Sequence, residues 1–221
     1  MELIELDEQI KYWNAFYKDS HPPSNPTSFA EYCLPFIKYK STLLELGCGN
    51  GRDSIYFAKN NISVYASDIS SYAIDSIKNY VNINNINNMT FINEDFTNFN
   101  TNQYTENFQA IYSRFTIHTI LQDKISKVFK WSYNALSDGG LIMIETRSTK
   151  DPLFASGKGK LIEHNTILYE EGHIRHFVER DELVNSLLSE GFDLVEDTES
   201  NNLSIYEGDN PVLLRVIARK N

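Results

Sequence analysis

Three glycines at alternate positions, Gly47, Gly49 and Gly51, follow an apolar run that begins near Thr42 and precede the helical pattern of residues 54–58. Glycines in such a loop can take positive φ and bring backbone N–H groups close to a ligand, which a Cβ would obstruct. About twenty residues later a second apolar run, Ile62–Ser67, ends in Asp68, where a βαβ nucleotide site places the carboxylate that accepts the ribose hydroxyls. The pattern predicts a strand, a tight loop, a helix and a second strand that together hold an adenosine-containing cofactor.

The spacing of the glycines separates two classes of cofactor. A dinucleotide loop reads G-x-G-x-x-G/A, and this chain has Arg52 at the sixth position. The segment Glu45–Gly51, with an acidic residue two positions before its first glycine, instead resembles the first motif of class I S-adenosylmethionine-dependent methyltransferases. That resemblance implies S-adenosylmethionine as the cofactor and S-adenosylhomocysteine as the product. An ordinary glycine turn that closes a βα unit is the structural alternative.

Apolar segments alternate with helical patterns along the chain, which favours an α/β fold with a parallel sheet covered on both faces. A chain of 221 residues is expected to form a single domain. The resemblance covers about residues 40–146 and 179–219 and implies a Rossmann-like, seven-stranded, mostly parallel sheet with an antiparallel last strand. Residues 1–40 are expected to supply amino-terminal helices and a cap loop, and residues 147–178 an insertion on the substrate side.

Individual elements follow from local patterns. Ser28 is predicted to cap a helix, with Glu31 three positions later completing a capping box. Helical spacing of apolar residues predicts helices over residues 10–17, 125–136 and 181–188. Further strands are predicted at residues 62–67, 89–93, 110–113, 141–146, 192–196 and 212–218.

The formal net charge of −10 argues against a nucleic-acid substrate, because proteins bind phosphate backbones with basic faces. A small-molecule acceptor is therefore expected. No apolar run is long enough to span a bilayer, and the amino terminus carries Glu2 and Glu5 where a signal peptide carries basic residues. These features predict a cytoplasmic protein without a membrane partner, and the expected assembly is a monomer or a homodimer.

The resemblance assigns cofactor contacts residue by residue. The glycine loop would face the methionine end, and Asp68 would hold the ribose hydroxyls. Asp95 matches the acidic residue that accepts a hydrogen bond from the adenine amine, with a helix cap or turn as the alternative, and Phe96 would pack on the base. Whether the aromatic residues of the amino-terminal helix seal this pocket or only pack that helix is left open. The predicted cofactor-binding set is Tyr12, Glu45, Gly47, Cys48, Gly49, Gly51, Asp68, Ile69, Asp95, Phe96 and Ser113.

Methyl transfer from a sulfonium is an in-line displacement, so the protein must align the acceptor and take its proton if the acceptor is a hydroxyl. His118, a few residues past the fourth predicted strand, is the first candidate base and is expected to face the mouth of the cleft. The alternative for His118 is a structural role, as a histidine packed under the start of a helix. His173 and His176 are the other candidates for the base. Arginines stand near the strand ends where a metal-dependent enzyme needs carboxylates, which predicts a reaction without a metal ion. The predicted catalytic set is His118, His173 and Arg175.

The segment that follows residue 146 is rich in basic groups although the whole chain is acidic. Arg147 and Arg175 are predicted to act as fork-shaped donors to an anionic substrate, with a solvated loop of scattered charge as the alternative. Residues 112–115, 145–148, 151–153, 173–177 and 210–218 resemble a group of bacterial methyltransferases associated with capsule or lipopolysaccharide gene clusters. This resemblance implies O-methylation of a sugar, a phosphosugar or a phosphoramidate-type modification of surface polysaccharide. His176 departs from that group, which has a second arginine there, and the predicted substrate-binding set is Arg114, Arg147, Arg175 and His176.

Three other functions stay open. A tellurite- or thiol-directed methyltransferase would share the cofactor half and would have a softer, less charged acceptor pocket. An NAD-dependent oxidoreductase is disfavoured by the glycine spacing. A non-catalytic module would bind S-adenosylmethionine without turnover, because a fold alone does not imply catalysis.

Overall fold

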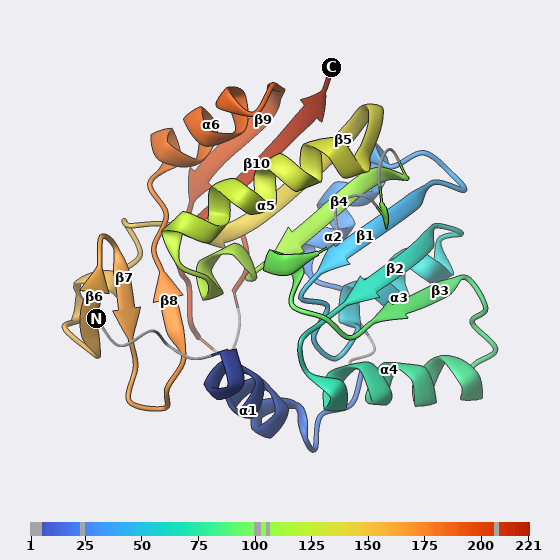
Figure 1. Cartoon of the computed structure of the whole chain (residues 1–221), viewed down its shortest axis with the longest axis horizontal. Coiled ribbons are helices and arrows are strands. Elements are labelled where there is room, and N and C mark those ends of the chain that lie inside the picture. Colours follow the sequence, from blue (N-terminus) through green and yellow to red (C-terminus); the bar gives the residue numbers. More distant parts are fainter. Residues whose placement is uncertain (1–5, 23–24, 100–102, 105–106, 206–207) are drawn as a thin grey trace.

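A seven-stranded sheet forms the centre of the chain (Figure 1). Its strands are β1 (Thr42–Leu46), β2 (Ser63–Ser67), β3 (Met89–Ile92), β4 (Phe108–Arg114), β5 (Leu136–Arg147), β9 (Phe192–Ser200) and β10 (Leu213–Lys220). The strand order is β3-β2-β1-β4-β5-β10-β9. Strands β1 to β5 pair in parallel, and β10 is antiparallel to both β5 and β9. The Rossmann-like sheet with an antiparallel last strand, expected from the sequence, is confirmed.

The computed structural model describes residues 6–22, 25–99, 103–104, 107–205 and 208–221. The acidic amino-terminal residues that favoured a cytoplasmic protein lie outside these ranges. Among the described residues, no helix is both long enough and apolar enough to cross a membrane.

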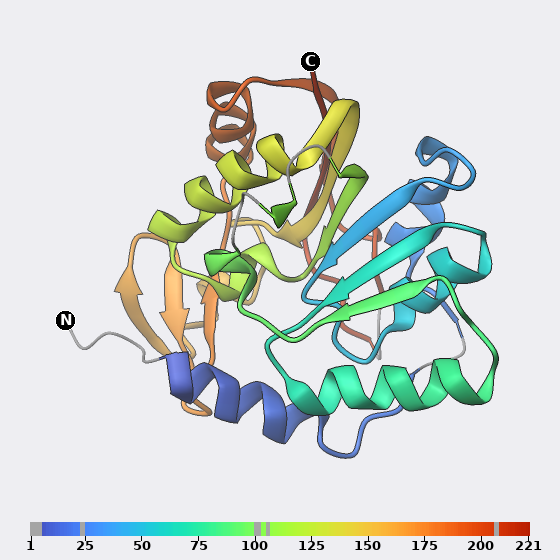
Figure 2. The same cartoon turned by 45° about the vertical axis from the view of Figure 1, so that its right-hand side comes forward.

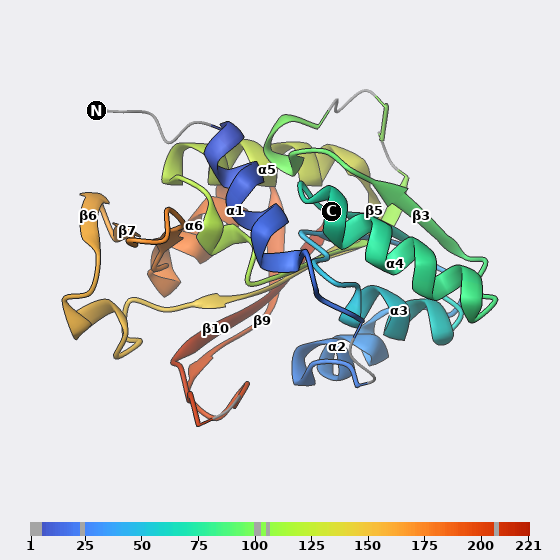
Figure 3. The same cartoon turned by 90° about the horizontal axis from the view of Figure 1, so that it is seen from below.

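Helices cover both faces of the sheet, as the alternating pattern predicts. The helices α2 (Ser28–Cys33), α3 (Arg52–Lys59) and α4 (Ser71–Ile83) pack on one face, and α5 (Gln122–Ala135) and α6 (Arg180–Ser189) pack on the other. Figure 3 shows α2 and α5 on opposite sides of the strands. Successive strand residues enter different cores: Leu43 and Met143 pack with the first group of helices, and Leu44 and Ile144 with the second. Because both faces are buried, these strands read as continuous apolar runs.

The helix α1 (Leu6–Tyr17) lies against α4, near the ends of β1 and β2 (Figure 2). None of its residues is fully buried, and Tyr12, Trp13 and Tyr17 are half-buried. Two hydrogen bonds hold it in place: Ser70 Oγ donates to Asn14 Oδ1 at 2.9 Å, and Gln9 Nε2 donates to the carbonyl of Gly172 at 3.0 Å. The second bond connects α1 to the 147–178 segment.

Residues 147–178 contain a second, three-stranded antiparallel sheet that the sequence pattern does not predict. Its strands are β6 (Lys160–Glu163), β7 (Thr166–Leu168) and β8 (Ile174–His176). A parallel bridge between Ser148 and Val178 closes the base of the segment. Strand β8 packs beside the short helix η4 (Ile117–Thr119), which follows β4. The segment therefore lies against the carboxyl end of the central sheet.

The predicted cap of α2 is wrong by one residue. Thr27, and not Ser28, is the N-cap, and its Oγ1 accepts a hydrogen bond from the backbone N–H of Ala30 at 3.2 Å. The buried carboxylate of Asp53 fixes this choice, because it accepts bonds of 2.8 Å from both the N–H and the Oγ1–H of Thr27. Ser28 becomes the first helical residue and donates to the carbonyl of Leu203 at 2.6 Å.

Candidate active site

The glycine loop between β1 and α3 has the left-handed conformation that its sequence predicts. Gly47, Gly49 and Gly51 have φ of +63°, +53° and +79°. A Cβ on Gly47 would lie 2.6 Å from Thr116 Cγ2, and one on Gly49 would lie 2.5 Å from the hydroxyl of Tyr17. The loop is tied to the next strand by the N–H of Cys48, which donates to the carbonyl of Ser67 at 2.8 Å. The loop is therefore closely packed on both sides and can accept only glycine at these positions without rearrangement.

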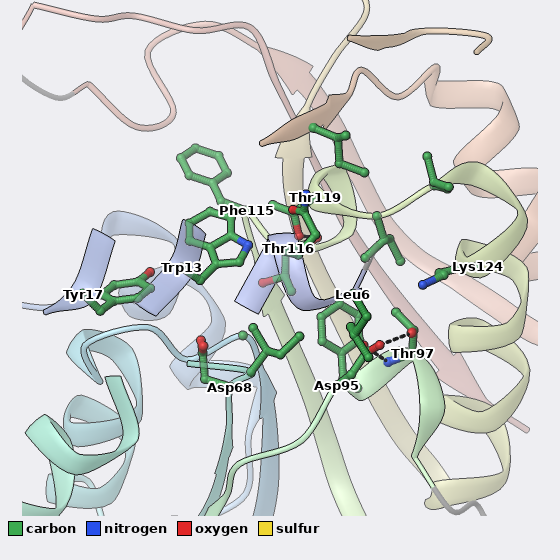
Figure 4. A pocket seen from close by; sticks show the side chains of 17 residues that line it. Leu6, Trp13, Tyr17, Asp68, Asp95, Thr97, Phe115, Thr116, Thr119 and Lys124 are labelled. Atoms are coloured by element: carbon green, nitrogen blue, oxygen red, sulfur yellow. Dashed lines mark hydrogen bonds between the residues drawn. The ribbon is translucent and has the colours of Figure 1, made fainter. Parts of the chain in front are cut away.

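Asp68 follows β2 and points into the space beside this loop (Figure 4). Its Oδ2 accepts a hydrogen bond from the N–H of Gly49, and its Oδ1 accepts one from the N–H of Ser70, each at 2.8 Å. Burial raises the pKa of this carboxyl to about 6, although backbone N–H donors, those of Ser70, Gly49 and Ile69, oppose the shift. The carboxylate is thus held in a fixed orientation, and each oxygen keeps a lone pair for a further donor.

A pocket opens between the glycine loop, α1 and the ends of β2, β3 and β4. Trp13 and Tyr17 of α1 lie over Asp68 in Figure 4, and Phe115 lies beside the indole of Trp13. Burial, followed by the nearby Asp68 carboxylate, raises the pKa of the Tyr17 phenol, which therefore stays neutral. Of the residues predicted to bind cofactor, Gly47, Asp68, Ile69, Asp95 and Phe96 line this pocket.

Asp95 has the position of a pocket residue and the contacts of a helix cap. It lines the pocket, and it also caps the short helix η2 (Phe96–Asn98) by accepting from the N–H and Oγ1–H of Thr97 at 2.9 and 2.8 Å. Phe96 is nearly buried and forms part of the same wall. Asp95, which follows β3, lies on the far side of the pocket from Tyr17, as Figure 4 shows.

The remaining predicted cofactor residues lie behind the pocket wall or beside it. Glu45 is buried under the loop and accepts a hydrogen bond from Ser54; burial and then the neighbouring Asp53 raise the pKa of its carboxyl well above the usual range. Tyr12 points to the other side of α1 and stacks on His173 at a ring distance of 4.9 Å. Trp13 and Tyr17, which are not in the predicted set, occupy the position expected for Tyr12. The predicted residues outside the pocket lining are Tyr12, Glu45, Cys48, Gly49, Gly51 and Ser113.

His118 lies next to this pocket, in η4, and is 5% exposed. It is therefore enclosed and does not open to solvent at the cleft mouth as expected. Burial, followed by the charges of Arg175, Arg147 and Arg114, lowers the pKa of its imidazole well below the ordinary value, so the ring is neutral. Its Nδ1 has no hydrogen-bond partner among the described residues. A neutral imidazole with a free ring nitrogen can accept a proton.

The arginines predicted to bind substrate differ in whether they form an ion pair with a carboxylate. Arg114 Nε is 2.9 Å from Glu145 Oε1. Arg147 contacts Asp151 at 2.6 Å and Asp209 at 2.7 Å. Arg175 makes no ion pair with a described residue, and its buried Nε has no hydrogen-bond partner among them.

The two rivals of His118 have other neighbours. His176 is buried, and its Nδ1 is 2.8 Å from Thr166 Oγ1 within the small sheet. Burial lowers the pKa of His176 to about 4. His173 lies between two phenol rings, with Tyr12 on one side and Tyr169 at 4.8 Å on the other. His118 is the one of the three histidines placed beside the glycine loop and β4.

Residues 20–197 match a family model described as a methyltransferase domain. The chain belongs to this methyltransferase family. It is 24% identical over 208 residues to a tRNA N(3)-methylcytidine methyltransferase of Schizosaccharomyces pombe, a match that covers 85% of this chain and 81% of that protein. The enzyme class and the cofactor expected from the glycine motif agree with this membership.

Solved methyltransferase structures share the fold. A SAM-dependent methyltransferase from Methanosarcina mazei superposes with a TM-score of 0.74 at 19% identity, over 84% of this chain and 95% of that one. The 1,6-didemethyltoxoflavin-N1-methyltransferase of Burkholderia thailandensis, solved with its substrate and S-adenosylhomocysteine, has a TM-score of 0.74 at 14% identity over 100% and 92% of the two chains. At these identities the likeness establishes the methyltransferase fold.

The described residues of the methyltransferase include one group with the spacing of metal ligands, His164, Glu179 and Glu182, at the surface between the small sheet and α6. None of the three lines the pocket described above. At the ends of β4 and β5, Arg114 and Arg147 occupy the carboxylates of Glu145, Asp151 and Asp209, which a divalent cation there would need as ligands.

Replacing Gly47 with alanine is expected to lower the free energy of unfolding of the methyltransferase by about 1–3 kcal/mol, which combines left-handed strain with the clash against Thr116. Thr116 cannot move aside easily, because its Oγ1 donates to the carbonyl of Leu46 at 2.7 Å. Gly139→Ala is the matched control, since Gly139 has φ of +73° and open space around its Cβ position. Urea unfolding of the two variants should show the larger loss for Gly47→Ala, and equal losses would mean that the clash is relieved without cost.

Proposed function

We propose that this methyltransferase transfers the methyl group of S-adenosylmethionine to a hydroxyl oxygen of a small, anionic or sugar-containing acceptor, without a metal ion. The observation that carries the proposal is the neutral, enclosed His118 beside a pocket lined by Gly47, Asp68 and Asp95. An O-methyltransferase has to remove a proton from its acceptor, and an imidazole with a free nitrogen suits that task.

The pocket residues fit the proposed cofactor. Gly47 leaves the loop backbone without a side chain at the pocket, the Asp68 carboxylate faces inward as a ribose acceptor would, and Phe96 offers an apolar surface for a base. S-adenosylmethionine supplies an electrophilic methyl group on a sulfonium centre. The protein would hold the acceptor hydroxyl in line with that group, enclose it under Trp13 and Tyr17, and take the hydroxyl proton at the His118 imidazole.

Surface polysaccharide is the proposed context of the acceptor. Support for it comes from the sequence resemblance of residues 112–115, 145–148 and 173–177, and from the basic groups that surround His118. Those cationic groups are less suited to tellurite or thiol acceptors, which call for a softer pocket. Sugars, phosphosugars and sugar nucleotides are the acceptors to assay first.

An RNA acceptor is the second candidate, because the curated relative from S. pombe is a tRNA methyltransferase. The net charge of −10 opposes it, since binding of a phosphate backbone draws on clusters of Lys and Arg. Filter binding of bulk tRNA at low ionic strength tests this candidate directly. Tight binding that weakens steeply with salt would favour RNA over a small acceptor.

Calorimetric titration with S-adenosylmethionine, S-adenosylhomocysteine and NAD is the experiment that tests the cofactor. Binding of the first two and not of NAD supports the proposal, and binding of NAD alone would overturn it. Transfer of a labelled methyl group to the sugar panel then separates an enzyme from a non-catalytic binding module.

The affinity for S-adenosylhomocysteine is expected to fall about tenfold per pH unit below pH 6, if only the ionised Asp68 accepts the ribose hydroxyls. Calorimetry between pH 7.5 and 5 measures this slope, and Asp68→Asn is expected to flatten it. The pH dependence of the free energy of unfolding has the opposite sign. Because the pKa of Asp68 is raised in the folded state, its protonation stabilises the fold as the pH drops through 6. A loss of affinity in that range is therefore not explained by unfolding through Asp68.

A further inference from the structure

Three arginines, Arg114, Arg147 and Arg175, lie near His118 on the acceptor side, and carboxylates pair with the first two. Glu145 is fully buried and pairs with two, Arg114 Nε at 2.9 Å and Arg215 Nε at 2.7 Å. Arg147 is held by Asp151 and Asp209. Asp151 has its second oxygen occupied as well, because Oδ1 accepts from the N–H of Leu153 at 2.9 Å. These arginines have their charge satisfied within the protein.

Arg175 of β8 is the exception. It forms no ion pair with any residue in the described part of the chain, its Nε is buried without a partner, and its guanidinium lies 5.4 Å from the ring centre of Tyr169. Burial and the nearby Arg147 charge lower the pKa of this guanidinium, although it remains a cation at neutral pH. Arg175 is half-buried, and the charge of Asp151 acts on it without a direct ion pair. A partly desolvated charge of this kind is stabilised by an anion that binds directly beside it.

The surroundings of Arg175 place it on the acceptor side. The charge of Arg175 contributes to the lowered pKa of His118. Strand β8 packs against η4, which carries His118, and the preceding residue, Ile174, lines the cofactor pocket. Tyr12, His173 and Tyr169 form a continuous stack beside it, with ring distances of 4.9 and 4.8 Å. The site therefore combines an arginine that makes no ion pair with a described residue and an aromatic wall.

We propose that Arg175 binds an acidic group of the acceptor, a carboxylate or a phosphate, and thereby positions the acceptor next to His118. This inference rests on the proposed methyltransferase function and narrows its substrate class to anions. The sequence predicts that Arg147 and Arg175 both donate to the anion. In the structure only Arg175 is left for that role, because both Nη atoms of Arg147 already bind carboxylates. Arg175 is a binding residue in this arrangement, and a neutral acceptor of the same size is expected to bind more weakly because it leaves the Arg175 charge unpaired.

The test uses the protein loaded with S-adenosylhomocysteine and two anion probes, inorganic phosphate and acetate, at constant ionic strength set with chloride. Binding is followed by the NMR shifts of the His118 ring protons. Saturable shifts are expected with at least one probe in the wild type, with an affinity at least tenfold weaker in Arg175→Gln and largely restored in Arg175→Lys. The probe that binds more tightly distinguishes a phosphate from a carboxylate acceptor.

Arg180→Gln is the matched control, because Arg180 is an exposed arginine paired with Asp197 and Asp181 and its loss changes the net charge equally. It should bind the probes as the wild type does. The absence of saturable binding by either anion, or unchanged binding in Arg175→Gln, would overturn the inference. If the wild type does not bind S-adenosylhomocysteine at all, the proposed function is overturned. Failure of the proposed function is therefore distinguishable from failure of the Arg175 inference.

Discussion

Replacing His118 with glutamine is expected to lower the rate of methyl transfer by about 10²–10⁴-fold while the affinity for S-adenosylhomocysteine stays unchanged. Glutamine keeps a polar side chain in the enclosed site and cannot take the acceptor proton. The rate is measured in single turnovers with an acceptor from the sugar panel, and the affinity by calorimetry. The expected loss corresponds to about 3–5 kcal/mol of transition-state stabilisation.

His164→Gln serves as the control, because His164 is exposed on the small sheet and does not line the pocket. It should leave the rate unchanged. A fall in cofactor affinity in His118→Gln would assign His118 a packing role, which is the alternative considered for it from the sequence. An unchanged rate would remove it as the base.

The charge environment of His118 connects this expectation with the proposal for Arg175. In the free protein the imidazole has a strongly lowered pKa, with Arg175 as the largest nearby charge, and is a weak base. An acidic acceptor that neutralises Arg175 would raise that pKa and make the ring a better proton acceptor. The acceptor would then strengthen its own general base, and a neutral analogue would fail to do so.

The glycine loop and the sheet could be predicted from the sequence because their signals are local. Apolar runs, turn residues and the carboxylates at strand ends place Asp68 and Asp95 at one edge of the sheet, where the structure also has them. The cap of α2 could not be predicted, because Thr27 and Ser28 are both good caps and the distant Asp53 decides between them.

The acceptor side was harder to predict because its arrangement depends on tertiary pairing. The sequence predicts Arg147 as an unpaired cation, because its partner Asp209 is 62 residues away along the chain. The strands of the small sheet are only three or four residues long and carry many charges, so no periodic pattern marks them. The orientation of α1, which turns Trp13 rather than Tyr12 toward the pocket, likewise depends on how that helix packs.

Replacing Asp68 with alanine is expected to weaken S-adenosylhomocysteine binding by about 1.5–3 kcal/mol, or roughly ten- to 150-fold, because the ribose hydroxyls lose a charged acceptor. The change also leaves the N–H groups of Gly49 and Ser70 without their carboxylate partner, so the glycine loop loses part of its support. Asp68→Asn separates the two effects, since an amide oxygen can still accept one of these bonds while the negative charge is gone. Asp75→Ala, which removes an exposed carboxylate on α4, controls for net charge.

The affinity for S-adenosylhomocysteine is measured by calorimetry, and the stability of each variant by thermal unfolding. Weakened binding in both Asp68 variants, with the fold intact in Asp68→Asn, assigns the carboxylate to the cofactor. Unchanged affinity would leave Asp68 as a residue that only holds the loop.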